Sequence, residues 1–231
     1  MILTPSQART FYDRFGSWQD TQGFYEDTAL DALIAHAHFE RAQSVFELGC
    51  GTGRFASSLL KKHLPRGASY LGIDISNTMI NIASERLAPY AGRAKVTHCN
   101  GSIVFPFPDR SVDRVVSTYV FDLLSEKAID QALCEAHRVL TPGGKLCLVS
   151  LTEGTTPVSR AVSGIWSMLF RLYAPMVGGC RPVRLESLMD RQQWSVEYRS
   201  VVTPFGVPSE VLVAAPRMHT QRGGLGRTQC N

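Results

Sequence analysis

The sequence predicts a single α/β domain built on a mostly parallel sheet with helices on both faces. Short apolar runs alternate with helical patterns between about residues 44 and 150, and strands that alternate with helices form parallel sheets. A glycine-rich segment stands at the first junction between a strand and a helix. The chain has 231 residues, of which 44% are hydrophobic and 19% charged, which suits one domain with a packed core.

Each predicted element has a local signal. Strands are expected where apolar and β-branched residues run together, at residues 44–48, 69–74, 95–99, 113–118 and 145–150. Helices are expected between them, where apolar residues recur at helical spacing, at residues 55–63, 76–88 and 126–140. The turn Thr141-Pro142-Gly143-Gly144 ends the last of these helices and leads into the fifth strand.

The pattern changes after Ser150. Residues 152–182 carry apolar and aromatic side chains without clean strand character, and residues 185–192 are expected to form a short helix. Residues 194–202 and 209–215 indicate two strands with so short a link that they must be antiparallel. The domain is therefore expected to span 1–216, followed by a disordered tail at 217–231 that is rich in Gly, Arg, Gln and Thr.

Composition excludes several classes of partner. The net charge of +4 is modest and the basic residues are scattered, so we expect no nucleic-acid binding. The six cysteines form no C-x-x-C pair and have no histidine at zinc-finger spacing, which predicts no metal site. The first ten residues lack a secretory signal and no apolar stretch reaches about 18 residues, so we expect a cytoplasmic protein.

The strongest local signal is the segment Glu47–Gly53, Glu-Leu-Gly-Cys-Gly-Thr-Gly, between the first strand and its helix. Glycines let the chain turn sharply and let a ligand approach the backbone. Asp74 ends the next strand, where a carboxylate can accept hydrogen bonds from both hydroxyls of a ribose. A turn that only allows tight packing is the alternative explanation, but the combination with Glu47 and Asp74 favours a nucleotide-like ligand.

The glycine spacing distinguishes two ligand classes. Dinucleotide-binding folds use G-x-G-x-x-G, whereas here the third glycine comes one residue early and Arg54 occupies the place of the last one. This spacing disfavours a nicotinamide-dependent oxidoreductase. Glu47, two positions before the first glycine, suits the cationic sulfonium and ammonium groups of S-adenosylmethionine.

With these residues the segment from about 44 to 150 resembles the class I methyltransferase family, in the small-molecule branch that includes ubiquinone and menaquinone C-methyltransferases. The resemblance rests on four motifs in the family's order, Val45–Gly53, Gly72–Ser76 with Met79, Phe105–Val116 and Arg138–Leu146. It implies a Rossmann-like fold with the strand order 3-2-1-4-5-7-6 and an antiparallel last strand. The motifs are specific for the family but not for a substrate.

The resemblance also implies the cofactor and its binding residues. It places the methionine part of S-adenosylmethionine near Glu47, the ribose on Asp74 and the adenine against Ile75. The full set that it implies is Glu47, Gly49, Cys50, Gly51, Gly53, Asp74, Ile75, Met79, Gly101, Ser102 and Thr118. One departure is that Asn100-Gly101-Ser102 stands where the family usually has Gly-Asp-Ala, so the contact to the adenine amino group must come from another group.

Methyl transfer from a sulfonium is an in-line displacement, and no catalytic residue is evident from the sequence. The end of the fourth strand offers two weak candidates. Tyr119 could face the sulfonium through a cation–π contact or be a packed aromatic. Asp122 could be a general base or an exposed carboxylate at the start of a helix.

Two segments could cover the site. Residues 1–43 are expected to form a helical cap, either over the site or over the sheet edge, and residues 152–182 an acceptor insert. Within that insert, residues 165–177 could line an acceptor pocket, form a dimer face or touch a membrane surface. We therefore expect a methyltransferase acting on a small hydrophobic or aromatic acceptor, as a monomer or homodimer. The alternative is a catalytically inactive or regulatory cofactor-binding protein of the same fold.

Overall fold

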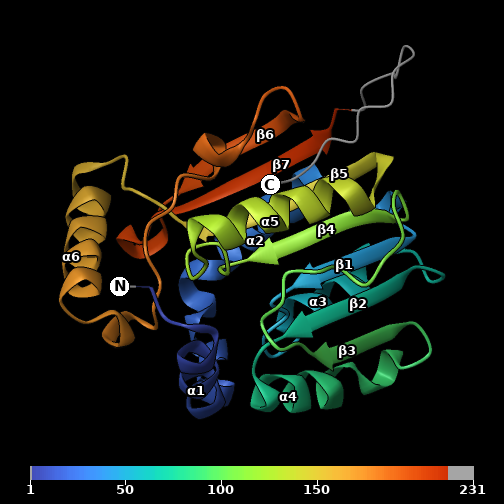
Figure 1. Cartoon of the computed structure of the whole chain (residues 1–231), viewed down its shortest axis with the longest axis horizontal. Helices are drawn as coiled ribbons and strands as arrows, with labels where there is room; N and C mark the ends of the chain where they lie inside the picture. Colours follow the sequence, from blue (N-terminus) through green and yellow to red (C-terminus); the bar gives the residue numbers. More distant parts are fainter. Residues whose placement is uncertain (1, 218–231) are drawn as a thin grey trace.

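The computed structural model describes residues 2–217, apart from the side chains of residues 17, 175 and 176; the tail predicted at 217–231 lies outside it from residue 218 on. Its centre is a seven-stranded sheet with the order β3-β2-β1-β4-β5-β7-β6 (Figure 1). The strands are β1 (Ser44–Leu48), β2 (Ser69–Asp74), β3 (Ala94–His98), β4 (Val112–Thr118), β5 (Leu140–Leu151), β6 (Trp194–Val202) and β7 (Ser209–Pro216). The predicted strand order is confirmed.

Strand directions follow from the connections. The five strands β3, β2, β1, β4 and β5 run parallel, and β7 pairs antiparallel with both β5 and β6. The central strand β1 is an almost continuous apolar run, because both of its faces are covered: Val45 and Phe46 are buried.

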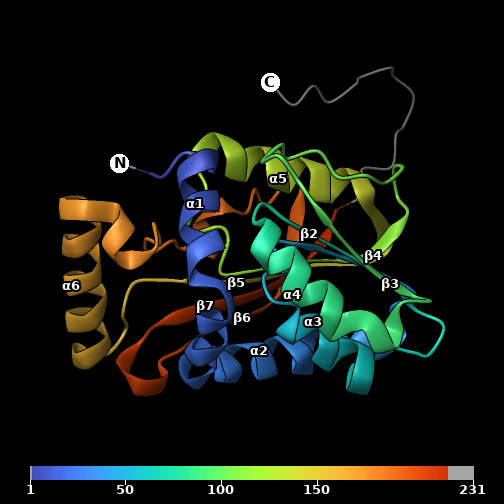
Figure 2. The same cartoon turned by 90° about the horizontal axis from the view of Figure 1, so that it is seen from below.

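Helices cover both faces of the sheet (Figure 2). On one face lie α2 (Gly23–Ala37), α3 (Arg54–Ser58) and α4 (Asn77–Leu87), and α5 (Glu126–Val139) covers the other. The helix predicted at 55–63 is present as α3 followed by one π-helical turn, Leu59–His63. Each face has its own apolar core: α5 contributes Ile129 and Leu133 to one, and α2 contributes Leu30 and Leu33 to the other.

Two further helices lie beyond the carboxyl ends of the parallel strands, α1 (Pro5–Phe15) and α6 (Pro157–Tyr173) (Figures 1 and 2). Helix α1 is attached to the start of α4. The Asp13 carboxylate accepts a hydrogen bond of 2.6 Å from the Ser76 hydroxyl and one of 3.3 Å from the Thr78 amide. A 3-10 segment, Gly16–Gln22, connects α1 to α2, so the N-terminal part of the chain crosses the edge of the sheet where ligands bind in folds of this kind.

The C-terminal third differs from the sequence-based prediction. Residues 152–182, where no regular element was assigned, contain the long helix α6, which begins with a capping box at Thr156 and Ser159. The short helix predicted at 185–192 is a single 3-10 turn, Leu185–Leu188. The turn predicted at 141–144 lies inside β5 as a bulge, because Val112 pairs with Leu140 and Arg114 with Lys145.

Candidate functional site

The glycine loop after β1 bends sharply toward the end of β2. Gly49, Gly51 and Gly53 all have left-handed backbones, with φ values of 77°, 50° and 72°. A Cβ atom on Gly49 would lie 2.3 Å from Val120 Cγ2, so a side chain at this position would collide with the loop after β4. The Gly49 amide also donates a hydrogen bond of 2.8 Å to the Ile73 carbonyl. Glycine is therefore required here by close approach as well as by conformation.

Asp74 links this loop to the end of β2. One carboxylate oxygen accepts a hydrogen bond of 2.9 Å from the Gly51 amide, and the other accepts one of 2.9 Å from the Ser76 amide. Burial raises the pKa of Asp74, while the amides of Ser76 and Gly51 oppose that shift. The carboxylate is thus held in one orientation, with acceptor capacity left for a ligand.

Glu47 is an acidic side chain almost completely removed from solvent. It is 1% exposed, and its carboxylate accepts a hydrogen bond of 2.5 Å from the Tyr70 hydroxyl. Burial raises the pKa of Glu47 to about 7. Gly72 makes this arrangement possible, since a Cβ atom there would lie 2.7 Å from the Tyr70 hydroxyl oxygen. A cation placed beside Glu47 would favour its charged form.

A cavity of about 340 Å³ opens where the glycine loop, β2, β4 and α1 meet, and its walls are mainly apolar. A smaller pocket of about 40 Å³ adjoins it, and five residues line both spaces: Gln19, Gly49, Gly51, Thr118 and Tyr119. The predicted cofactor residues that line one or both are Glu47, Gly49, Cys50, Gly51, Asp74, Ile75, Met79, Gly101 and Thr118.

Two predicted cofactor residues do not line either space. Gly53 precedes the first turn of α3, and a Cβ atom on it would lie 3.1 Å from Ala83 Cβ, so it allows close packing of α3 on α4. Ser102 is exposed, and its amide donates to the Asn100 side chain at 3.0 Å. Of the three residues Asn100-Gly101-Ser102, which depart from the family pattern, Gly101 is the one that lines the cavity.

The N-terminal segment closes the outer side of the site. Leu3, which precedes α1, and Pro5, Ala8 and Tyr12 of α1 line the larger cavity, and Gln19 lines both spaces. The Gln19 side-chain oxygen is buried and has no hydrogen-bond partner among residues 2–217. A Cβ atom on Gly51 would lie 3.2 Å from that oxygen, so the segment rests directly on the glycine loop.

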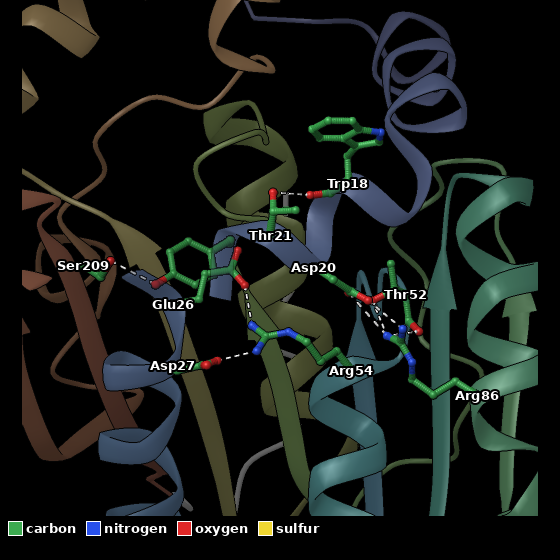
Figure 3. Close-up of polar contacts among 10 residues, drawn as sticks. Trp18, Asp20, Thr21, Glu26, Asp27, Thr52, Arg54, Arg86 and Ser209 are labelled. Carbon is green, nitrogen blue, oxygen red and sulfur yellow. Dashed lines mark hydrogen bonds and ion pairs between the residues drawn. The ribbon is translucent and has the colours of Figure 1, made fainter. Parts of the chain in front are cut away.

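Two ion-pair clusters fasten this segment (Figure 3). The Asp20 carboxylate accepts hydrogen bonds of 2.6 Å from the Arg86 guanidinium and from the Thr52 hydroxyl. In the second cluster, Arg54 at the start of α3 donates to Glu26 at 2.8 Å and also pairs with Asp27.

The sequence analysis missed both clusters. The sequence predicted only a helical cap at residues 1–43, and the fold is what brings Asp20 within reach of Arg86. Burial raises the pKa of Glu26 to about 7, although Arg54 opposes the shift.

The two catalytic candidates lie in different surroundings. Tyr119 lines both spaces, has a left-handed backbone with a φ of 56°, and donates a hydrogen bond of 3.0 Å to the Ser209 hydroxyl. Asp122 is fully buried rather than an exposed carboxylate at a helix start. Its oxygens make no hydrogen bond of ordinary geometry among residues 2–217, the Cys180 thiol lies close enough to oppose the rise of its pKa, and Asp122 does not line the cavity. Burial raises the pKa of Asp122 to about 7.

Residues 165–177 do not line the main cavity, contrary to the expectation of an acceptor wall there. The physical reason is that α6 packs outside α1, which occupies the position next to the cofactor cleft (Figures 1 and 2). Trp166 instead fastens α6 to the domain, because its indole N–H donates a hydrogen bond of 3.1 Å to the Cys180 carbonyl.

Within residues 2–217 there is no group of three or more His, Cys, Asp or Glu side chains that could hold a metal ion. Of the helices in that range, none is both long and apolar enough to cross a membrane.

The strand order, the glycine loop and the acidic residue at the end of β2 together define a Rossmann-like fold of the class I methyltransferase type. Residues 45–144 match the family model described as a methyltransferase domain. Among curated proteins, the chain is 33% identical over 148 residues to an uncharacterised methyltransferase of Geobacillus kaustophilus. That match covers 60% of this chain and 65% of the relative.

A ubiquinone/menaquinone biosynthesis C-methyltransferase of Geobacter sulfurreducens is 32% identical over 139 residues, which cover 58% of this chain and 51% of that protein. The chain therefore spans between half and two thirds of the length of these relatives. The solved structures that it resembles include the geranyl diphosphate C-methyltransferase of Streptomyces coelicolor, with a TM-score of 0.63 and 14% identity over 84% of this chain and 79% of that one. They also include the [4+2]-cyclase SpnF, with a TM-score of 0.61 and 15% identity over 82% and 80% of the two chains. At such identities the likeness shows the fold alone.

Proposed function

We propose that this protein is an S-adenosylmethionine-dependent methyltransferase that acts on a small, apolar or aromatic acceptor. The observation that carries the proposal is the pair of adjoining spaces at the glycine loop. The oriented carboxylate of Asp74 lines the larger space, the buried acid Glu47 lines the smaller space that adjoins it, and the walls of the larger space toward α1 are apolar. A volume of about 340 Å³ is within the usual range for a small-molecule site.

The residues present fit the cofactor. Asp74 keeps acceptor capacity for ribose hydroxyls, and Ile75 and Met79 give an apolar surface for an adenine ring. The carboxyl of Glu47 is buried and pairs with no cationic side chain among residues 2–217. This suits the binding of an ammonium group in the small pocket. When bound, S-adenosylmethionine supplies an electrophilic methyl group on a sulfonium.

The contribution of the chain is to hold the reactants in line and to keep water out. Much of the rate of such a displacement can come from alignment alone. Tyr119 lies at the junction of the two spaces with its ring fixed through Ser209, so we propose that it faces the sulfonium. We do not assign the role of general base to Asp122, because its carboxyl lies outside the cavity wall.

The acceptor is proposed to occupy the part of the cavity lined by the N-terminal segment and the start of α5. Leu3, Leu123 and Leu124 are among its lining residues, and they offer dispersion contacts but no charge. Small-molecule acceptors also appear in the names of relatives, such as ubiquinone or menaquinone precursors and geranyl diphosphate.

The test is a transfer assay in which the full chain is incubated with S-adenosylmethionine carrying a labelled methyl group and a panel of small acceptors. The panel includes phenols, quinols and apolar alcohols, with charged amino acids as the contrasting set. We expect label in an apolar or aromatic acceptor together with an equal amount of S-adenosylhomocysteine. Cofactor binding without transfer to any acceptor class would support the regulatory alternative instead.

A further inference from the structure

The outer side of α6 is an unusual surface for a helix packed on a domain. Four large apolar side chains recur there at helical spacing, and they are between 55% and 74% exposed: Val158, Ile165, Met168 and Leu172. These four residues are called the α6 outer face below. Exposed apolar stripes of this kind mark interaction surfaces.

The apolar stripe points outward because the other side of α6 is the one fastened to the domain. The buried residues of α6 are small and polar: they are Ser159 and Ser163, and the Ser163 hydroxyl accepts a hydrogen bond of 3.0 Å from the Gly154 amide. Trp166 completes the attachment through its hydrogen bond to the Cys180 carbonyl. The outer face therefore makes no contribution to the apolar cores of the domain.

The apolar surface continues past the first turn of α6. Phe205, at the tip of the β6–β7 connection, is 79% exposed and packs edge-on against Phe24 with ring centroids 5.4 Å apart. The next residue, Gly206, lies against α6, since a Cβ atom on it would lie 3.2 Å from Val158 Cγ1.

The charged side chains within the α6 segment are all arginines, although Glu153 and Glu186 flank the segment and Glu153 pairs with Arg184. Residues 154–185 contain four arginines and no aspartate or glutamate. Two of the arginines, Arg160 and Arg171, are exposed on α6, and at 3.6 residues per turn both lie along the same edge of the apolar stripe. A helix with an apolar face edged by arginines has the pattern of helices that lie in the interface of an anionic membrane. A protein partner that covered this face would have to bury both arginines or pair them.

We propose that the α6 outer face, together with Phe205, docks the protein on the surface of an anionic lipid bilayer. With 17 residues, α6 would lie along that surface over about 25 Å. The docking itself does not depend on the proposed function.

The chain that follows α6 connects the docked helix to the wall of the cavity. The chain that follows α6 packs on the N-terminal segment: Cβ atoms on Gly178 and Gly179 would lie 3.2 Å from a ring carbon of Phe11 and 2.6 Å from Leu3 Cδ1. Leu3 lines the main cavity. A bilayer against α6 would therefore lie on the side of the domain where the N-terminal segment forms the cavity wall.

The experiment is flotation of the full chain with vesicles of phosphatidylcholine containing about 30% phosphatidylglycerol, and with vesicles of phosphatidylcholine alone. We expect binding to the anionic vesicles, several-fold weaker binding to neutral ones, and release by added salt. Met168→Glu and Leu172→Glu each should lower the affinity for anionic vesicles about tenfold, because each removes a large apolar contact. Both side chains are more than half exposed, so the fold should tolerate the changes.

The matched control is Val104→Glu, which places the same charge at an apolar residue that is 61% exposed and lies outside α6. It should bind vesicles like the wild type. Failure of the wild-type chain to bind anionic vesicles would overturn the proposal, as would an equal loss in the control. A wild-type dimer in light scattering that Met168→Glu dissociates, without any vesicle binding, would assign the face to a second copy of the chain. Cofactor affinity measured on the same variants separates these outcomes from a failure of the proposed function.

Discussion

Asp20 and Arg86 join the N-terminal segment to α4 through a hydrogen bond of 2.6 Å between the Asp20 carboxylate and the Arg86 guanidinium. The same arginine donates to the Thr52 carbonyl at 3.0 Å, so one side chain connects the cap, the glycine loop and α4. The proposed cofactor site lies underneath this connection. We therefore expect the intact pair to slow the exit of a bound ligand through this side.

Asp20→Asn should therefore speed cofactor release. The change keeps the shape of the side chain but removes the charge from two hydrogen bonds, which costs about 1–1.5 kcal/mol. We expect the dissociation rate of S-adenosylmethionine in stopped-flow fluorescence to rise about fivefold to tenfold. The control is Glu153→Gln, which weakens the exposed pair between Glu153 and Arg184 far from the cavity. Equal release rates in the wild type and Asp20→Asn would contradict a gating role for the cap.

Glu47 should make cofactor binding depend on pH. Burial raises the pKa of Glu47 to about 7 in the free protein, and a bound ammonium group would favour the charged form. A proton must then be lost on binding at low pH, so affinity should fall as the pH falls. From pH 7.5 to pH 6 we expect the Kd of S-adenosylmethionine in calorimetry to increase about tenfold.

The Glu47→Gln variant gives the control for this titration. The variant should bind S-adenosylmethionine more weakly than the wild type at pH 7.5. Its Kd should change little between pH 6 and pH 7.5. If the variant keeps the full dependence, another group is responsible, and Glu26 and Asp74 are the next candidates, since burial also raises their pKa.

The sequence predicts those parts of the fold and of the candidate site that depend on residues close together in the chain. The glycine loop and Asp74 were found because a left-handed turn and a strand-end carboxylate leave a short, fixed pattern in the sequence. The strands were found because apolar runs alternate with helices. By contrast, the contact between Asp20 and Arg86 joins residues that are distant in sequence and separately unremarkable, so no local pattern marks it.

Of the three roles open for residues 165–177, the acceptor wall is not supported, for a related reason. An apolar, aromatic stretch after the fifth strand predicts a covered surface but not what covers it. In the structure α1 takes the place beside the cavity, and α6 lies outside it with Ile165, Met168 and Leu172 exposed. The apolar composition predicted that this segment forms an interaction surface. The position of α1 shows that this surface of α6 faces away from the cavity.

Tyr119 should act through its ring rather than its hydroxyl. Tyr119→Phe keeps the aromatic face and loses the hydrogen bond to Ser209, so turnover should fall by less than about threefold. Tyr119→Leu removes the face proposed to lie against the sulfonium, and turnover should fall about tenfold with cofactor affinity changed less. Steady-state kinetics with the acceptor found in the transfer assay provides the measurement. Equal turnover in Tyr119→Leu and the wild type would rule out a cation–π role.

Asp122 should destabilise the ligand-free protein as the pH rises. Its pKa is raised to about 7 by burial, well above that of an aspartate in an unfolded chain, so the folded state holds the proton more tightly. The stability that this provides is complete below about pH 4 and is lost as the pH rises through about 7. The melting temperature should therefore be lower at pH 8 than at pH 6.

Asp122→Asn removes the titration without a large change in shape. The variant should melt at a higher temperature than the wild type at pH 8, with a smaller difference between pH 6 and pH 8. A variant that is folded and stable but loses about 10²-fold in turnover would instead identify Asp122 as a general base.

The central claim is that the cleft around the glycine loop and Asp74 binds S-adenosylmethionine, and calorimetry with the full chain tests it most directly. We predict one site with a Kd in the micromolar range, about −7 to −8 kcal/mol. Asp74→Ala should weaken binding by about 1.5–3 kcal/mol, because it removes the acceptor for the ribose and the partner of the Gly51 amide. No saturable binding of S-adenosylmethionine or S-adenosylhomocysteine by the folded wild-type protein would contradict the account.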